Sequence, residues 1–381
     1  MVPNSSPLTL MAVHAHPDDE ASGTGGVLAR YAAEGVRTVL VTCTGGELGD
    51  APGGVKPGEP GHDPSAVVAV RAAELEESCR ILGVTHLERL GYHDSGMMGW
   101  EQNEAPDNFW NTPVDVAASR LGDLMEAYRP QVVVTYDANG FYGHPDHIQA
   151  HRITMAAAEA TGIPDKVYFT AIPKSALPEF EAMMAEAGVD MPEETTATEG
   201  EREGPEFGTD DELIAAVVDC APFVDAKYDA LAAHASQTED IFFLRLGREL
   251  FDRFFGQEAF VRAVDRTGAP VPEADLFAGL RCAQLVDRRQ SRQLSAAAAA
   301  NTTSAPSSTP NASVASGAAQ ESSKPKRPPF TERRNPTSVE AAKPAPSSEV
   351  PTRRQATTAT ATTRPLTAWR PKSTPMVAMW R

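Results

Sequence analysis

The order of apolar and amphipathic segments is the feature that most constrains the fold of this chain. Up to residue 172, short runs rich in β-branched residues alternate with longer segments of helical periodicity. The expected strands are residues 8–13, 37–44, 85–91, 131–137 and 166–172. The expected helices between them are residues 24–35, 64–83, 115–130 and 144–162. This βαβα alternation predicts an α/β fold, Rossmann-like, with a mainly parallel sheet and helices on both faces.

The pattern is weaker after residue 172. Residues 191–212 are acidic and rich in Glu, Thr and Gly, which is typical of a surface loop. A strand is expected over residues 213–220 and a helix over residues 225–237. Residues 241–265 are apolar enough to pack on the core. We therefore expect the folded domain to extend well past the last clear βα repeat.

Composition and charge change together near residue 288. The chain has a formal net charge of −18, but residues 288–381 carry 15 Lys and Arg against 4 Asp and Glu. That segment is dominated by Ala, Ser, Thr and Pro, so it cannot bury enough apolar surface to offset the entropy of ordering. The sequence therefore predicts a folded domain over residues 1–287 and a low-complexity, disordered basic tail over 288–381. The acidic domain would repel a phosphate backbone, which excludes nucleic acid as its partner.

Cysteine usage and the N-terminus indicate the compartment. The four cysteines are widely spaced and form no CxxC pair, so they read as reduced thiols rather than a disulfide framework or a zinc knuckle: Cys43, Cys79, Cys220 and Cys282. The N-terminal segment lacks a basic region, and its apolar run is too short for a signal peptide or a membrane span. We expect a cytoplasmic protein without a membrane partner.

Polar side chains follow four of the expected strands at the points where these strands end. The segments are "HPDDE" (16–20), "TCTGGE" (42–47), "YHDSG" (92–96) and "DANGFYGHPDH" (137–147). Ligands of open α/β sheets bind outside the carboxyl ends of the strands, so we expect these segments to meet at one rim. Two H-P-D elements, far apart in the sequence, would then share one site.

The two H-P-D elements contain the residue types of a catalytic metal site. A histidine and an aspartate at short spacing, with a histidine from another strand, supply three ligands and leave one position for water. Such a set suits Zn²⁺ best, and Fe²⁺ or Mn²⁺ can use the same ligands. Either Asp18 or Asp19 is then not needed as a ligand, and a free carboxylate beside a metal is a natural general base. If His147 is the ligand, His144 is free to stabilise negative charge that develops on the substrate.

Simpler roles are open for some of these residues. An H-P-D-D segment can be only a helix N-cap and first turn, because aspartate is favoured at those positions. The occurrence of two such elements at strand ends favours the metal site. His14 lies on the same strand face as His16, and His151 lies one helical turn after His147. We expect His14 and His151 to support the site by packing or orientation.

Together these segments resemble those of the PIG-L-like (LmbE-like) zinc-dependent N-deacetylases. "HAHPDDE", "TCTGGE", "DSGM" and "GHPDH" follow the first to fourth strands in the order and spacing of that family. The resemblance covers about residues 8–175, extends more loosely to about 280 and does not reach the tail. The most similar branch is that of the actinobacterial mycothiol enzymes, one of which deacetylates GlcNAc-inositol while another cleaves mycothiol S-conjugates.

The resemblance implies a division of labour within the two H-P-D elements. It implies one Zn²⁺ per subunit, with Fe²⁺ as the alternative, held by His16, Asp19 and His147. Asp18 would be the general base. His144 would face the developing oxyanion and protonate the leaving amine, and Asp146 would orient His144. Tyr142 would add a hydrogen bond to the oxyanion.

Three further residues are expected to bind substrate. Arg71, in "RAAEL", and Asp94, in "DSGM", match positions of the family that hold sugar or inositol hydroxyls. Arg71 could instead form an ion pair with Glu74 or Glu76 on the helix surface, and Asp94 could only form a turn. Glu47 lies at the rim as well, although the two glycines before it could mark no more than a tight turn.

The function implied is hydrolysis of an N-acetyl group on a small amino-sugar substrate, giving acetate and a free amine. The best candidate is the GlcNAc-inositol intermediate of mycothiol biosynthesis. Gly23 stands where S-conjugate amidases tend to have lysine, and Gly143 stands where they tend to have proline. Both differences favour the deacetylase branch.

The alternatives within the enzyme class are a mycothiol S-conjugate amidase and an antibiotic-tailoring sugar deacetylase. Outside that class, they are a sugar-binding protein without turnover and an adaptor whose basic tail recruits acidic partners. A glycosidase would need two carboxylates across a sugar and no metal. A serine hydrolase would need a G-x-S-x-G elbow, which the sequence lacks.

Overall fold

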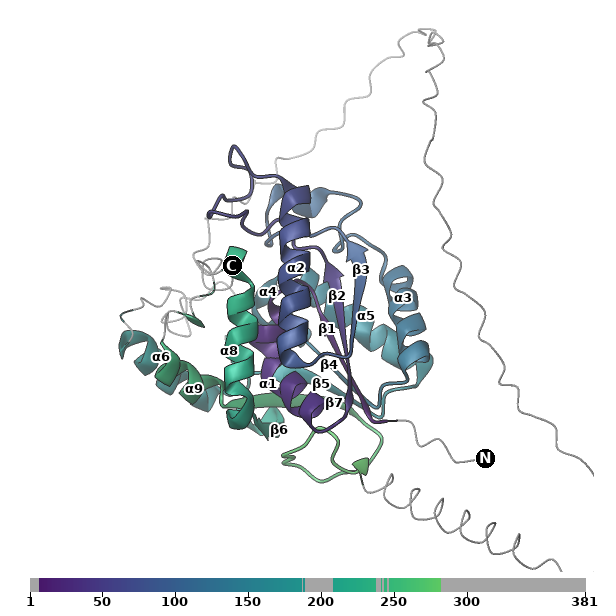
Figure 1. Cartoon of the computed structure of the whole chain (residues 1–381). Coiled ribbons are helices and arrows are strands. Elements are labelled where there is room, and N and C mark those ends of the chain that lie inside the picture. Colours follow the sequence, from purple (N-terminus) through teal and green to yellow (C-terminus); the bar gives the residue numbers. More distant parts are fainter. Residues whose placement is uncertain are drawn as a thin grey trace, which may run out of the picture. The chain divides into compact units, whose positions relative to one another are not determined.

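A seven-stranded sheet forms the centre of the molecule in the computed structural model, which describes residues 7–186, 188, 208–237, 241, 243–244 and 247–281 (Figure 1). The strands are β1 Thr9–His14, β2 Arg37–Thr44, β3 His86–Tyr92, β4 Val132–Thr135, β5 Lys166–Ala171, β6 Ile214–Asp219 and β7 Gln257–Asp265. Their order is β3-β2-β1-β4-β5-β7-β6. The first five pair in parallel, and β7 is antiparallel to both β5 and β6. The predicted α/β fold with a mainly parallel sheet is confirmed.

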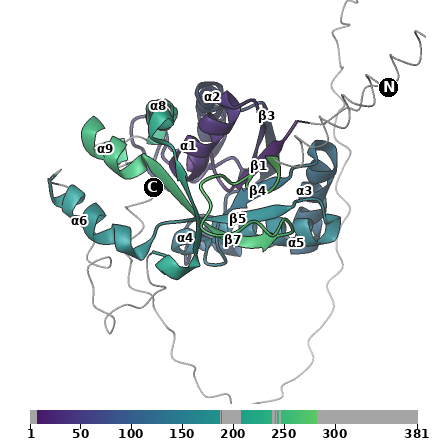
Figure 2. The ribbon, with the colours of Figure 1, turned by 90° about the horizontal axis from the view of Figure 1, so that it is seen from below.

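Helices cover both faces of this sheet. They are α1 Asp19–Ala33, α2 Pro64–Leu82, α3 Val114–Tyr128, α4 Gly140–Gly143, α5 Pro145–Thr161, α6 Leu177–Glu186, α8 Val224–Ala233 and α9 Arg248–Phe255. Figure 2 shows α1, α2 and α8 on one side of the sheet and α5 on the other. None of the described helices is long and apolar enough to cross a membrane.

Alternation along β1 divides the core into two layers. Leu10 and Ala12 belong to the apolar cluster beneath α1, α2 and α8, whereas Met11 and Val13 belong to the cluster beneath α3 and α5. All four side chains are fully buried. A strand buried on both faces is apolar throughout, which is why "LMAV" shows no polar alternation. The central strands are therefore held rigidly, and so are the loops that leave their carboxyl ends.

The first helix begins earlier than its periodicity predicts. The sequence pattern placed it over residues 24–35, whereas α1 starts at Asp19. Its first turn is acidic, with Asp19 and Glu20, and carboxylates are favoured there because they face the positive end of the helix dipole. The apolar periodicity of α1 starts only after this polar first turn, where the helix meets the sheet. As a consequence, the "HPDDE" segment is the junction of β1 and α1 rather than a loop.

The chain after β5 completes the sheet and the helical layer. The predicted strand over 213–220 is confirmed as β6, and the predicted helix over 225–237 is confirmed as α8. Residues 241–265 pack on the core as expected, and there they form α9 and the strand β7, which lies between β5 and β6. Residues 191–207 of the acidic segment 191–212 and the tail 288–381 lie outside the described residues.

The last described residues pack against α1. The Tyr31 hydroxyl donates to Asp275 at 2.9 Å and accepts the backbone N–H of Leu276 at 2.8 Å. The Phe277 ring meets the Tyr31 ring edge-on, with 5.1 Å between the centroids. Residues up to about 281 are thus part of the core that supports the N-terminal half of the sheet.

Candidate active site

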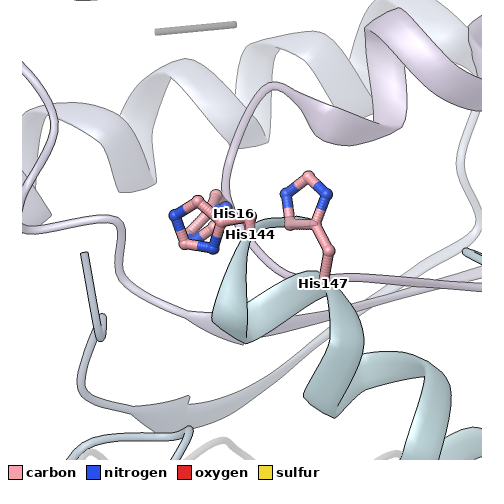
Figure 3. A group of neighbouring side chains, drawn as sticks. All are labelled: His16, His144 and His147. Carbon is pink, nitrogen blue, oxygen red and sulfur yellow. The ribbon is translucent and has the colours of Figure 1, made fainter. Parts of the chain in front are cut away.

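The two H-P-D elements meet because β1 and β4 are adjacent parallel strands. Leu10, Met11 and Ala12 pair with Val132, Val133 and Val134. The segments that follow the two strands therefore leave the sheet at the same edge. Figure 3 shows the imidazoles of His16, His144 and His147 gathered there, and the nitrogen atoms they present lie within 4.8 Å of one another.

Asp19 lies between two of these histidines. Its Oδ2 is 3.3 Å from His16 Nδ1, and its Oδ1 is 3.4 Å from His147 Nε2. The backbone N–H of His16 also donates to Asp19 Oδ2 at 2.8 Å, which fixes the carboxylate. Donors bound tetrahedrally at 2.0–2.1 Å from one Zn²⁺ are separated by about 3.3 Å. The two Asp19 contacts therefore have the separation of neighbouring ligands of one small divalent ion, and His16, His144 and His147 form a group of potential ligands at the same place.

His147 gives a second reason to place an ion here. The residue is buried, yet neither ring nitrogen has a hydrogen-bond partner among the described residues. Buried polar atoms are normally satisfied, and an orphaned pair of imidazole nitrogens is expected where a ligand is absent. Stacking on the Tyr136 ring, with centroids 4.1 Å apart, holds the plane of the His147 ring.

The other nitrogen of His16 faces buried carboxylates. His16 Nε2 lies 3.3 Å from Asp146 Oδ2 and 3.7 Å from Asp94 Oδ1. Burial alone would lower the pKa of His16, but the negative charges and hydrogen bonds of these carboxylates outweigh burial and raise it. A carboxylate on the second nitrogen is the usual way in which a metal-binding histidine is oriented. His16, Asp94 and Asp146 also form a second group of potential ligands.

Asp146 differs from its expected role. Its carboxylate does not reach His144 but accepts from the backbone N–H of Ser95 at 2.9 Å and from the Ser95 hydroxyl. His144 is instead held by the Asp146 backbone, whose N–H donates to His144 Nδ1 at 3.1 Å. The cause is the helix: His144 is the N-cap of α5, so its side chain folds back onto the first turn. Asp146 orients His144 through the main chain and His16 through its carboxylate.

Asp18 stands beside the potential metal ligands without joining them. It is the N-cap of α1 and has a left-handed backbone, with φ 106° and ψ −28°. Its Oδ2 accepts from Arg71 Nη2 at 2.9 Å. Burial raises the pKa of Asp18 to about 6, although the positive charge of Arg71 opposes the rise. A carboxylate with this pKa is mostly ionised at neutral pH and is still basic enough to take a proton.

Arg71 is buried and serves the loops rather than the helix surface. Besides Asp18, it donates to the carbonyl oxygens of Pro17 and Gly46. The alternative of a surface ion pair between Arg71 and Glu74 or Glu76 is wrong. Glu74 accepts from Ser236, and Glu76 pairs with Arg89. Gly46 has φ 63°, and a Cβ there would lie 2.4 Å from Arg71 Nη1. The glycine is needed both for the turn and for the space that Arg71 fills.

Glu47 and Asp94 join the loops that follow β2 and β3. Glu47 Oε1 lies 2.8 Å from His93 Nδ1 and accepts the backbone N–H of Asp94 at 3.1 Å. Asp94 accepts the N–H groups of Leu48 and Gly96 at 3.3 and 2.8 Å. Asp94 also lines a cavity beside Asp18, whereas Glu47 does not. Asp94 thus has the turn role that we considered and also faces the cavity.

The two flanking histidines support the site. His14 Nε2 lies 2.8 Å from the Thr24 hydroxyl, and its Nδ1 lies 3.2 Å from the Tyr136 hydroxyl. Burial lowers the pKa of His14 to about 4, so the ring is neutral. His151 Nδ1 lies 2.9 Å from the Tyr136 carbonyl oxygen. Through Tyr136, both histidines position the segment that follows β4, which is the supporting role expected for them.

Comparison with known proteins agrees with this geometry. The model of the PIG-L family, described as GlcNAc-PI de-N-acetylase, matches residues 11–158. A 1D-myo-inositol 2-acetamido-2-deoxy-alpha-D-glucopyranoside deacetylase of Salinispora arenicola is 44% identical over 294 residues, which span 73% of this chain and 94% of the relative. The chain belongs to the PIG-L family. A protein of the same name from Acidothermus cellulolyticus is 41% identical, over 73% of this chain and 97% of the relative. An N,N'-diacetylchitobiose deacetylase structure from Pyrococcus horikoshii matches with a TM-score of 0.43 and 20% identity, over 69% of this chain and 86% of that chain.

Two cavities flank the site of this PIG-L protein. The smaller one, of about 60 Å³, is lined by the two adjacent aspartates and by residues of the loops around them: His16, Asp18, Asp19, Leu48, Gly49, Asp50, Arg71, Asp94, Gly96, Met97, Trp100, Tyr142, His144 and Gln237. A larger one of about 640 Å³ has Asp19, Tyr142 and His147 on its wall, with Gly23 and several aromatic side chains beyond them. Asp19 and Tyr142 line both cavities. Asp19 therefore lies between the two cavities, with His16 on the wall of the smaller one and His147 on the wall of the larger one.

Some residues beside the site were not found from the sequence. Glu20 and His234, which are both fully buried, lie behind Asp18. Ser95 holds the Asp146 carboxylate. Glu20 was visible as the last letter of "HPDDE", but its partner is more than two hundred positions away. No local signal in the sequence marks such a pair, because each residue is common in helices of ordinary composition.

Proposed function

We propose that this chain is a metal-dependent N-deacetylase that acts on 1D-myo-inositol 2-acetamido-2-deoxy-α-D-glucopyranoside, the acetylated intermediate of mycothiol biosynthesis. Relatives at 38–44% identity that carry this name support the substrate. The observation that carries the chemistry is the pair of adjacent aspartates. Asp19 bridges two histidines at 3.3 and 3.4 Å, while the next carboxylate, Asp18, is held by Arg71 and left for proton transfer.

Zinc is the metal that we propose, held by His16, Asp19 and His147. Two imidazole nitrogens and one carboxylate are a common donor set of catalytic zinc, and Fe²⁺ can use the same set. When bound, the ion supplies a Lewis acid and lowers the pKa of a coordinated water to about 7. Asp94 and Asp146 then face the other ring nitrogen of His16 and orient its imidazole, so these two carboxylates support a metal ligand instead of binding the metal themselves.

The residues of the chain supply the remaining steps. Asp18 takes a proton from the attacking water, whose oxygen forms the new bond to the acetamide carbon. His144 is neutral, because burial and the nearby imidazoles His16 and His147 lower its pKa. Its Nδ1 accepts the Asp146 N–H, so its proton is on Nε2, where it can donate to the developing oxyanion. Tyr142 adds a second donor.

The leaving nitrogen needs one proton before the C–N bond breaks. The sequence resemblance assigned that proton to His144. A neutral imidazole whose pKa is lowered can donate a hydrogen bond, but it has no extra proton to give to the nitrogen. Asp18 carries the proton taken from water and stands in the same cavity. We therefore assign the delivery to Asp18. Acetate and the free amine leave, and the carboxylate is restored.

An amine-release assay tests this function. The zinc-loaded chain is compared on the GlcNAc-inositol substrate, on free N-acetylglucosamine and on a mycothiol S-conjugate. We expect the first to have the highest kcat/KM. Faster turnover of the conjugate would identify an amidase instead. Saturable sugar binding without any amine release, in the presence of Zn²⁺ or Fe²⁺, would identify a binding protein.

Replacement of Asp146 by asparagine tests the support of His16. Asparagine keeps the size of the side chain and can still accept from Ser95, but it loses the negative charge that faces His16 Nε2. We expect zinc affinity, measured by competition with a chelator, to fall about 10- to 100-fold. The free energy of unfolding without metal serves as the control. An unchanged zinc affinity would show that Asp146 does not act on the ligand.

We further propose that residues 1–287 carry the whole activity. The contacts of Tyr31 with Asp275, Leu276 and Phe277 support the proposal, because they make residues up to 277 part of the core. A chain that ends after residue 287 is expected to keep kcat and KM within about twofold, and its melting temperature within a few degrees. A truncation after residue 270 removes those contacts and should unfold. An unfolded or inactive 1–287 product would contradict the boundary.

A further inference from the structure

A buried hydrogen-bonded group lies behind Asp18, on the side away from the potential metal ligands. Its centre is Glu20, in the first turn of α1, which is fully buried. Glu20 Oε2 accepts the backbone N–H of Asp18 at 3.0 Å. Glu20 Oε1 lies 2.8 Å from His234 Nε2 and 2.5 Å from the hydroxyl of Ser78. We refer to Glu20, Ser78 and His234 as the Glu20 cluster.

The Glu20 cluster joins three helices. Glu20 belongs to α1 and Ser78 to α2, while His234 is the residue that directly follows α8. Figure 1 shows α8 running beside α1 and α2, and these helices are in contact. The side chain of His234 therefore connects the C-terminal part of the domain with the β1–α1 junction. The hydrogen bond of the His234 side chain is with Glu20, and its Nε2 lies 2.8 Å from Glu20 Oε1.

Asp18 needs such support because of its backbone. With φ 106° it lies in the left-handed region, which a residue with a Cβ adopts only at a cost in free energy. Its N–H donates to Glu20, and its carboxylate accepts from Arg71. One contact fixes the direction of the peptide plane and the other fixes the side chain. Loss of the first would let the peptide turn and move the carboxylate.

Glu20 in turn depends on His234. A fully buried carboxylate is costly unless it is paired and hydrogen-bonded. The Glu20 carboxylate accepts the Asp18 N–H and the Ser78 hydroxyl, and of its three partners His234 alone has a side chain that can carry a positive charge. Without His234, the Glu20 carboxylate would keep only neutral donors. It would then turn toward water, which weakens its contact with Asp18.

We propose that His234 is a positioning residue of the reaction: through Glu20 it holds the general base Asp18 in its left-handed conformation beside the metal site. The inference rests on the proposed deacetylase function and assigns a role to a residue that lies outside the four segments at the strand ends. Ser78 is the second support of the same carboxylate. His234 contributes through Asp18 alone, so its effect must disappear when Asp18 is absent.

Kinetic variants test this dependence. His234→Ala is expected to lower kcat for amine release about 10- to 100-fold, since small displacements of a catalytic group have effects of that size. KM and zinc content should not change. His234→Gln places a donor nitrogen near the position of Nε2 and should recover most of the rate. In an Asp18→Ala background, His234→Ala should cause no further loss. Equal losses in both backgrounds, or a rise in KM with unchanged kcat, would overturn the proposal.

A matched control separates positioning from general destabilisation. Lys166 and Glu273 form another fully buried ion pair. Lys166 is the first residue of β5, so the pair lies at the end of the strands opposite to the site. Lys166→Met should lower the melting temperature while kcat stays within about twofold at a temperature where the protein is folded. A His234→Ala variant that behaves in the same way would show that His234 has only a structural role.

Hydrogen exchange supplies a readout that does not need activity. The Asp18 amide, bonded to a buried carboxylate, should exchange slowly in the unaltered chain and at least about tenfold faster in His234→Ala. The Lys166→Met variant should leave it protected. If the unaltered chain released no amine, the proposed function would fail, and the exchange rates would still decide whether His234 positions Asp18. Unchanged protection in His234→Ala would overturn the positioning role.

Discussion

Replacing Asp18 by alanine is expected to lower kcat by about two to four orders of magnitude while zinc remains bound. The Asp18 side chain is hydrogen-bonded to Arg71, and its backbone is hydrogen-bonded to Glu20, Ala21 and Ser22, so the alanine variant removes no contact of the proposed ligand set. It removes the group that takes the proton of the attacking water. Single-turnover amine release and metal analysis of the purified variant measure the two quantities separately.

Asp18→Asn is the matched variant for this test. Asparagine keeps the size of the side chain and tolerates the left-handed region, but it cannot accept the proton. A loss of rate similar to that of Asp18→Ala would show that basicity matters rather than packing. Loss of zinc in either variant would make Asp18 a ligand. Near-normal kcat in Asp18→Asn would assign the base to another residue.

The second large effect is expected for His147→Ala. Zinc should fall from about one ion per chain to near zero, and amine release should fall with it, because one of three protein ligands is gone. His151→Ala is the matched control: it lies one turn later on α5 and bonds the Tyr136 carbonyl oxygen rather than the ligand set. That variant should keep its zinc. Metal analysis of both purified proteins decides the point.

The His147 variant also distinguishes the two groups of potential ligands. Full zinc content after His147→Ala would favour the group formed by His16, Asp94 and Asp146. His144→Ala should keep zinc and lose rate, since its Nδ1 is already bonded to the Asp146 N–H and we propose its Nε2 as an oxyanion donor. A His144 variant without zinc would instead show that the three imidazoles form the binding set.

The sequence allowed the sheet and the rim of the site to be predicted because both depend on local patterns. Runs such as "TVLV" and "VVVT" are apolar throughout, as strands buried on both faces must be, and β2 and β4 lie there. Once these strands are parallel, the segments after them must share an edge. The meeting of His16 with His147 follows from topology alone and needs no knowledge of side-chain contacts.

Other features depend on contacts that no local pattern records. The start of α1 at Asp19 was missed because its first turn is polar, and periodicity registers only the apolar face. The direction of the Asp146 carboxylate depends on the rotation of α5 about its axis, which brings it to Ser95 and His16. The strand β7 lies between β5 and β6 and pairs with both, and these pairings join segments far apart in the sequence.

The left-handed backbone of Asp18 also limits how stable this protein can become. Glycine adopts such a conformation freely, whereas aspartate adopts it only at a cost in free energy. In the proposed mechanism, Asp18→Gly would relieve this strain and would also remove the group that takes the proton. Stability and turnover would then favour different residues at position 18, and the aspartate favours turnover.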